Sequence, residues 1–187
     1  MDRAQALDLI HSWTTNPNLI KHMLAVEAQL RALARHYNQD EDLWGLAGLL
    51  HDADYQLFAN QPEKHPSKII EELQSKNVDS RIIQAIRSHA WGWQPGAPEP
   101  QSQLDWALYT SDELSGLIIA CALVRPDKKL SSLTLDSILK KWHTQSFAAG
   151  VHRDHILLCE TKLGIKLNDY ITICLNALQD ISSDLGL

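Results

Sequence analysis

The sequence predicts an all-α fold, and three observations support this prediction. Apolar residues recur at three- and four-residue steps along most of the chain, no convincing alternating strand appears, and capping residues precede several apolar stripes. With 187 residues, 44% hydrophobic content and no linker tract, the chain is long enough for one substantial core. We therefore expect a single domain over residues 1–187.

The first two predicted helices have clear start signals. Asn16 followed by Pro17 is a cap and first-turn pair, and apolar residues then recur to about Tyr37. Asp40 caps a second helix, whose acidic first turn suits the positive end of the helix dipole and which continues to His51. The second helix therefore ends at a histidine.

The middle of the chain alternates helices with irregular segments. Residues 54–64 are irregular, and Pro66 then stands where a third helix begins. Asp79 caps a fourth helix that ends near His89. The segment 91–100 is rich in Pro and Gly, so we expect a loop there.

Helices also dominate the C-terminal part of the chain. A long helix is predicted from Leu104 to about Val124, where Arg125-Pro126 stops it. Further helices are predicted over residues 135–142, 153–162 and 168–185. The apolar stretch 170–178 could pack internally or across a homodimer.

The composition excludes some classes of partner. A net charge of -6 and a pI near 5.8 argue against a broad binding surface for nucleic acid or anionic membrane. The N-terminus opens no apolar signal core, and no run approaches the ~20 apolar residues that a membrane span needs. Cys121, Cys159 and Cys174 show no C-x-x-C spacing, which predicts buried free thiols and favours a cytoplasmic location.

Polar residues at helix ends and on apolar helix faces indicate a metal site. His51 and Asp52 follow the apolar run 43–50, and a buried imidazole-carboxylate pair is costly to desolvate unless a metal ion compensates. His22 lies on the apolar face of its helix, where a lone histidine is more often a hydrogen-bonded core residue than a ligand. Asp112 stands in a strongly apolar helix and needs a partner, which is either a cation or a salt bridge or cap. Together the four suit Fe, Mn, Co, Ni or Zn.

The order of these residues resembles the HD-domain superfamily of metal-dependent phosphohydrolases. Residues 49–55 (Leu-Leu-His-Asp-Ala-Asp-Tyr) resemble its signature, and residues 104–112 resemble the helix that carries its last ligand. The resemblance covers roughly residues 16–124, and the segments 123–126 and 146–151 resemble a bacterial subgroup of predicted hydrolases. It implies an HD helical bundle over about 16–124, with a C-terminal helical extension over about 125–187. It also implies that one metal ion is held by His22, His51, Asp52 and Asp112.

Two further histidines raise the question of a second metal ion. His65 and His89 occupy positions that match the extra imidazoles of HD proteins with paired metals, and Asp52 would then bridge the ions. Two ions about 3.5–4 Å apart could activate a water and offset charge on a phosphate. Alternatively, His65 caps the following helix and His89 interacts with the helix dipole. One or two ions are therefore expected.

Other residues are candidates for chemistry and substrate binding. Asp52 and Asp54 are the candidate catalytic residues. Asp54 would orient a metal-bound water or act as general acid or base; alternatively, it caps the turn after His51-Asp52. Glu27 is expected to be solvated, because its five-residue separation from His22 puts it on a different helix face. Basic candidates for phosphate binding follow the last ligand: Arg125, which is preferred, Lys128, Lys129, Lys140, Lys141 and Arg153.

The tryptophans of the loop 91–100 form another candidate contact. Trp91 and Trp93 would serve as a lid or base-stacking surface, or as a structural anchor for the loop. Taken with the resemblance, the sequence predicts hydrolysis of a phosphate ester or anhydride in a nucleotide or other small phosphorylated metabolite. Two alternatives remain open: a di-iron HD-type oxygenase, and a non-catalytic binding or regulatory protein stabilised by its metal.

Overall fold

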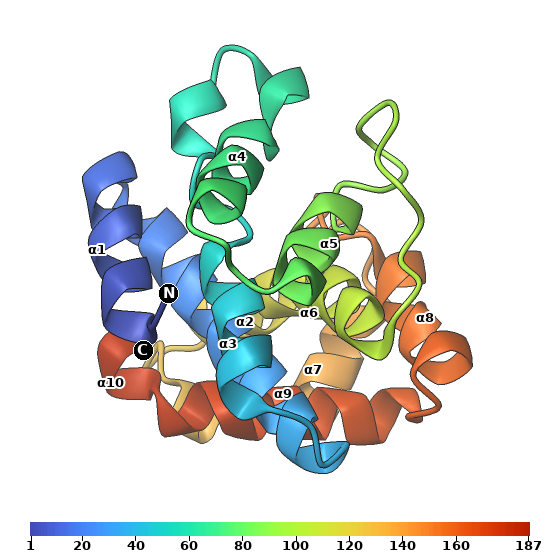
Figure 1. Ribbon diagram of the computed structural model, residues 1–187. Coiled ribbons are helices and arrows are strands. Elements are labelled where there is room, and N and C mark those ends of the chain that lie inside the picture. The colour runs from blue at the N-terminus through green and yellow to red at the C-terminus, as the bar shows by residue number, and fades with distance from the viewer.

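Ten α-helices and three 3-10 helices make up the regular structure of the chain, which a computed structural model describes over residues 1–187. It contains no strand, so the prediction of an all-α fold is confirmed. The α-helices are α1 (Arg3–Trp13), α2 (Pro17–His36), α3 (Glu41–Leu50), α4 (Ser67–Ser75), α5 (Ser80–Ser88), α6 (Gln103–Leu123), α7 (Leu135–Trp142), α8 (Arg153–Lys162), α9 (Leu167–Asp180) and α10 (Ser182–Leu185) (Figure 1).

Three parts of the chain differ from the sequence prediction. The helix α1 was not predicted, and it begins with a capping box in which the Asp2 side chain accepts from the backbone of Gln5. The helix predicted over residues 168–185 is instead two helices, because Ile181 leaves helical geometry between α9 and α10. The stretch 54–64, predicted to be irregular, contains two short 3-10 turns, Gln56–Phe58 and Pro62–Lys64.

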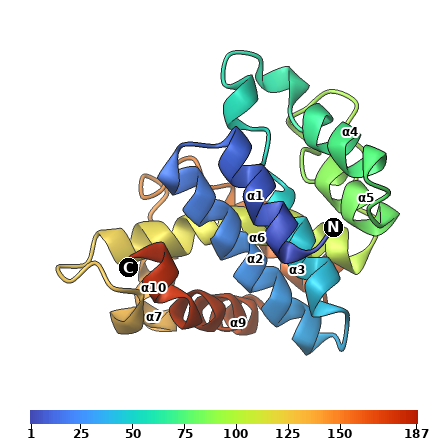
Figure 2. The same cartoon turned by 60° about the vertical axis from the view of Figure 1, so that its left-hand side comes forward.

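The two longest helices, α2 and α6, lie at the centre of the arrangement. The helix α2 packs against α3, α6 and α9, while α6 also packs against α5 and α8. In Figure 1, α4 and α5 lie above this centre and α9 runs beneath it, and Figure 2 shows α1 lying along α2 and α3. One hydrophobic core of 45 buried residues includes side chains from Ala6 in α1 to Leu185 in α10.

A close approach of α2 and α3 places the predicted ligands near each other. Gly48 of α3 faces the backbone of α2, and a Cβ atom there would lie 2.9 Å from the carbonyl oxygen of Val26. Only glycine therefore permits this approach. The consequence is that His51, three residues after Gly48, lies next to the helix that carries His22.

Glu27 is not solvated, which corrects the sequence prediction. Its side chain is buried in α2, where it accepts hydrogen bonds from Arg3 of α1 at 2.6 Å and from Arg31 at 2.9 Å. Arg31 also donates to Asp42 at the start of α3. The carboxylate is thus buried because two guanidinium groups compensate it, and it joins α1 to the α2–α3 pair.

The three cysteines are free and buried, as predicted. Burial raises the pKa of the Cys121 thiol to about 11 and that of Cys159 to about 12. None of the helices combines the length and apolar character needed to cross a membrane.

Candidate metal centre

Three helices bring the first group of predicted ligands together. His22 lies in the second turn of α2, His51 and Asp52 follow the end of α3, and Asp112 lies in the middle of α6. The Nε2 atom of His22 is 3.2 Å from Nε2 of His51, 3.0 Å from Oδ1 of Asp112 and 3.5 Å from Oδ2 of Asp52. Four donor atoms from distant parts of the sequence therefore surround one point.

A second group lies on the other side of Asp52. His65 precedes α4 and His89 follows α5, and their Nε2 atoms are 3.1 Å apart. Oδ1 of Asp52 is 3.2 Å from Nε2 of His65 and 3.7 Å from Nε2 of His89. Asp52 thus presents one carboxylate oxygen to each pair of imidazoles, so both groups could share it as a ligand.

The hydrogen bonds at the Nδ1 atoms show that all four imidazoles suit metal binding. His51 donates from Nδ1 to the carbonyl oxygen of Gly48 at 2.7 Å, and His89 donates in the same way to Ile86. The remaining Nδ1 contacts are those of His65 with Asp54 at 2.5 Å and of His22 with the Ser115 hydroxyl at 3.1 Å. Ser115 uses its own proton on the carbonyl of Asp112, so it accepts from His22. With Nδ1 protonated, each neutral ring turns an Nε2 lone pair towards the centre.

The electrostatics of the site favour a cation. Burial lowers the pKa of His51, but the charges of Asp52 and Asp112 outweigh it and raise the pKa to about 9. Burial also lowers the pKa of His65, and hydrogen bonds to Asp52 and Asp54 raise it to about 9. Burial alone would raise the pKa of Asp52, yet the surrounding imidazoles hold it well below its usual value. Positive charge is therefore stabilised on either side of Asp52.

The site opens to solvent at one side. The side chains of His51, His65 and His89 are at most 2% exposed, whereas Asp112 is 31% exposed and His22 is 23% exposed. A substrate therefore has access from the side of α2 and α6.

Asp54 lies behind the ligands. Its side chain is fully buried, one oxygen contacts His65, and the other accepts a hydrogen bond of 3.0 Å from the backbone nitrogen of Ile69. Both oxygens thus have partners, and these contacts suit a carboxylate that positions His65, while a role of Asp54 in acid-base catalysis stays a prediction.

The basic residues predicted to bind substrate point elsewhere. Arg125 lies two residues beyond the end of α6, donates to Ser132 at 2.7 Å and pairs with Asp127, and the part of α6 from Asp112 to Leu123 alone spans about 16 Å. Lys129 is exposed in the same connection. Arg153 donates to the carbonyl oxygens of Trp142 and Phe147, so it organises the segment before α8. Neither Arg125 nor Arg153 forms a hydrogen bond or ion pair with the candidate ligands, and substrate binding by Arg125 and Lys129 stays a prediction.

Trp91 is placed as the structural anchor, one of the two roles predicted for it, and not beside the candidate ligands. It packs against Trp106 and Tyr109 of α6 and is the anchor of the loop 91–100. Trp93 instead stacks on the ring of His65, with centroids 5.9 Å apart, and Tyr55 meets the same ring edge-on at 5.4 Å. Both side chains are 49% exposed, so they form the aromatic edge of the site.

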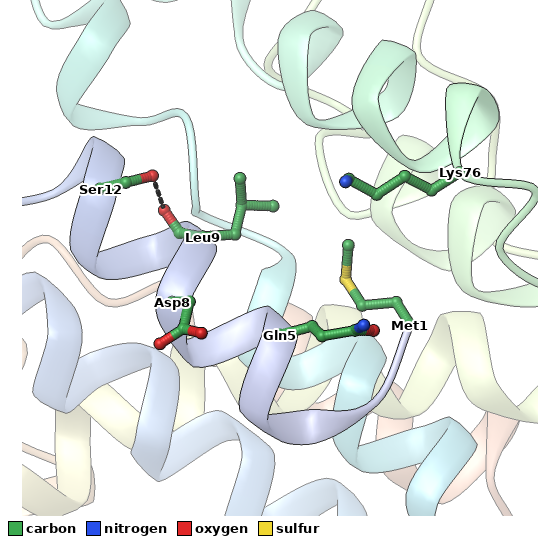
Figure 3. A pocket seen from close by; sticks show the side chains of 6 residues that line it. All are labelled: Met1, Gln5, Asp8, Leu9, Ser12 and Lys76. Atoms are coloured by element: carbon green, nitrogen blue, oxygen red, sulfur yellow. Dashed lines mark hydrogen bonds between the residues drawn. The ribbon is translucent and has the colours of Figure 1, made fainter.

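One surface pocket is separate from the candidate ligands. It has a volume of about 520 Å³ and lies between α1 and α4 (Figure 3). Its lining residues are Met1, Gln5, Asp8, Leu9, Ser12 and Lys76. Because it contains none of the candidate metal-site residues, it is not the candidate site.

Comparison with known proteins agrees with this geometry. The family model for the HD domain matches residues 19–119, which is more than half of the chain and includes every residue of the two ligand groups. No curated protein and no solved structure matched the chain. Since the matched region carries His51-Asp52 between His22 and Asp112, the chain belongs to the HD-domain superfamily, whose members are mostly metal-dependent phosphohydrolases.

Proposed function

We propose that this protein is a phosphohydrolase that uses two divalent transition-metal ions to hydrolyse a phosphate ester or anhydride in a small metabolite. The observation that supports this most directly is Asp52, whose Oδ2 faces His22 and His51 while its Oδ1 faces His65 and His89. Divalent ions held there would lower the pKa of a coordinated water and offset negative charge on a phosphate. Fe, Mn, Co, Ni and Zn all suit mixed imidazole and carboxylate ligands.

The residues around the site are consistent with a mechanism in which the metal ions, and not basic side chains, offset the phosphate charge. No Lys or Arg side chain forms an ion pair with the six ligands, so the cations themselves would offset the charge of the phosphate. The hydrogen bonds at Nδ1 fix the imidazoles, and Asp54 fixes His65. The chain thus holds the ligands rigidly, as catalysis by positioning requires.

The aromatic edge supports a nucleotide as the substrate class. Trp93 and Tyr55 both contact the ring of His65 and are half-exposed, and an indole face is a good stacking partner for a nucleobase. A nucleotide with its phosphate at the metal ions would place its base within reach of one of these rings.

The test is phosphate release from a panel of nucleotides and sugar phosphates, with Mn²⁺ or Co²⁺ and without oxygen. We expect turnover by the wild type and none by Asp52→Asn, whereas Asp136→Asn, an exposed aspartate of α7, should behave as wild type. Turnover that needs iron and oxygen would indicate the oxygenase alternative. Binding without any turnover would indicate the regulatory alternative.

A further inference from the structure

A third group of ligand-type side chains lies where α8 begins against α6. Glu113 of α6 faces His152, which caps α8, and His155 in the first turn of that helix. Nδ1 of His152 is 2.8 Å from Oε1 of Glu113, and Nδ1 of His155 is 3.6 Å from the same oxygen. These residues take no part in the two groups around Asp52.

The three side chains are arranged as an open metal site would be. One ligand atom from each residue lies within 4.8 Å of the others, and the two imidazole rings are stacked with centroids 4.9 Å apart. Two imidazoles and one carboxylate are a common ligand set for transition-metal dications. The His152 side chain is 62% exposed, which leaves a path for an ion and coordination positions for water.

A purely structural role explains only part of this geometry. Oε2 of Glu113 accepts a hydrogen bond of 2.9 Å from the backbone nitrogen of His152, which anchors the start of α8. That anchor uses only Oε2, whereas Oε1 lies within hydrogen-bond distance of Nδ1 of His152 and is the oxygen that both imidazoles approach. Glu113 can therefore bind an ion through Oε1 and keep the anchor through Oε2.

The hydroxyl of Tyr109 competes with a metal ion for one of the imidazole nitrogens. Its hydroxyl is 3.1 Å from Nδ1 of His155, the same nitrogen that faces Glu113. Burial, with the charges of Glu113, Asp154 and Asp112, raises the pKa of Tyr109 to about 12, so the hydroxyl stays protonated. It therefore competes for the lone pair of His155 and is not an anionic ligand.

We propose that Glu113, His152 and His155 form a third metal site, which binds one transition-metal dication such as Zn²⁺ or Co²⁺. The ion would join the start of α8 to α6, the helix that also carries Asp112. The proposal does not depend on the proposed function, because none of its residues belongs to the groups around Asp52.

The experiment measures Zn²⁺ binding by calorimetry to full-length protein whose other sites are already saturated. The wild type should bind one additional equivalent of Zn²⁺. The control variant His143→Gln, which removes an exposed histidine outside the site, should bind it as well. His155→Gln and His152→Gln should not bind this additional Zn²⁺, although both variants keep Glu113 and its contact with the start of α8. Tyr109→Phe, which removes the competing hydrogen bond, should bind at least as tightly as wild type.

Cobalt spectra and thermal unfolding give independent readouts. In the Asp52→Asn background, which removes the ions around Asp52, added Co²⁺ should produce d–d absorption and raise the unfolding temperature, and neither effect should occur once His155→Gln is combined with Asp52→Asn. Equal uptake by the wild type, His152→Gln and His155→Gln would overturn the proposal. No additional equivalent in the wild type would overturn it as well, and the group would then only anchor α8.

Discussion

The carboxylate of Asp54 accepts a hydrogen bond of 2.5 Å from Nδ1 of His65, with both side chains fully enclosed by the protein. A carboxylate in this position holds the imidazole in one orientation and makes its Nε2 atom a better metal donor. The same carboxylate also binds the backbone nitrogen of Ile69 in α4. Asp54 therefore connects a metal ligand to the helix that follows it.

Asp54→Asn should weaken the second metal ion selectively. We expect the affinity at His65 and His89 to fall by about 10–100-fold, because the imidazole loses its charged partner. The ion at His22, His51 and Asp112 should remain, as equilibrium dialysis with metal analysis would show. Unchanged affinity at both sites together with lost turnover would instead indicate that Asp54 acts in acid-base catalysis.

The position of Asp52 between the two imidazole pairs leads to a prediction about metal content. Asp52→Asn should lose both ions, because each carboxylate oxygen faces one pair. His22→Ala should lose only the first ion and His65→Ala only the second. Metal analysis of the purified variants distinguishes these outcomes, with circular dichroism as the control for folding. If Asp52→Asn keeps both ions, the bridging assignment is wrong.

The helices and the ligand types could be predicted because their signals are local. Periodicity and caps such as Asn16 and Asp40 mark α2 and α3 in the sequence, and the structure has both caps. The helix α1 gave little signal because only Ala6 and Ile10 of its residues are buried. The sequence also singled out the candidate ligands, because they are polar residues in apolar surroundings, and the structure brings them close together.

The surroundings of the site depend on tertiary structure and could not be predicted in the same way. Trp91 and Trp93 are two residues apart in a loop without regular period, so only the fold decides which of them stacks on His65. Arg125 belongs to the helix of Asp112, but α6 carries it away from the ligands. Glu27 was misjudged because its partner Arg3 lies on the helix that the sequence did not reveal.

Gly48 should be intolerant of any side chain. In Gly48→Ala the new Cβ atom would lie 2.9 Å from backbone atoms of Val26 and Glu27, so α2 and α3 would have to separate. We expect a loss of about 1–3 kcal/mol in the free energy of unfolding, measured with denaturant, and weaker metal binding at His22 and His51.

Gly116→Ala in α6 is the matched control for this change. Its Cβ atom would meet only Val151 Cγ2 at 3.6 Å, an ordinary contact, and a helix interior favours Ala over Gly by up to about 1 kcal/mol. This variant should be as stable as the wild type or more stable. Equal effects of the two substitutions would contradict the close approach of α2 and α3.

The buried thiols predict a loss of stability at alkaline pH. Burial raises the pKa of Cys159 from 9.0 to about 12, so the unfolded chain releases this proton above pH 9 while the folded chain keeps it. The stabilisation is complete below pH 9 and is lost as the pH rises towards 12, and the free energy of unfolding should decline in that range. Tyr37 and Tyr109, whose pKa values burial raises to about 12, act in the same direction above pH 10.

In Cys159→Ala the free energy of unfolding should therefore decline less steeply with pH than in the wild type. Urea unfolding from pH 8 to pH 11 measures this decline. An identical slope in both proteins would mean that the Cys159 thiol ionises in the folded state.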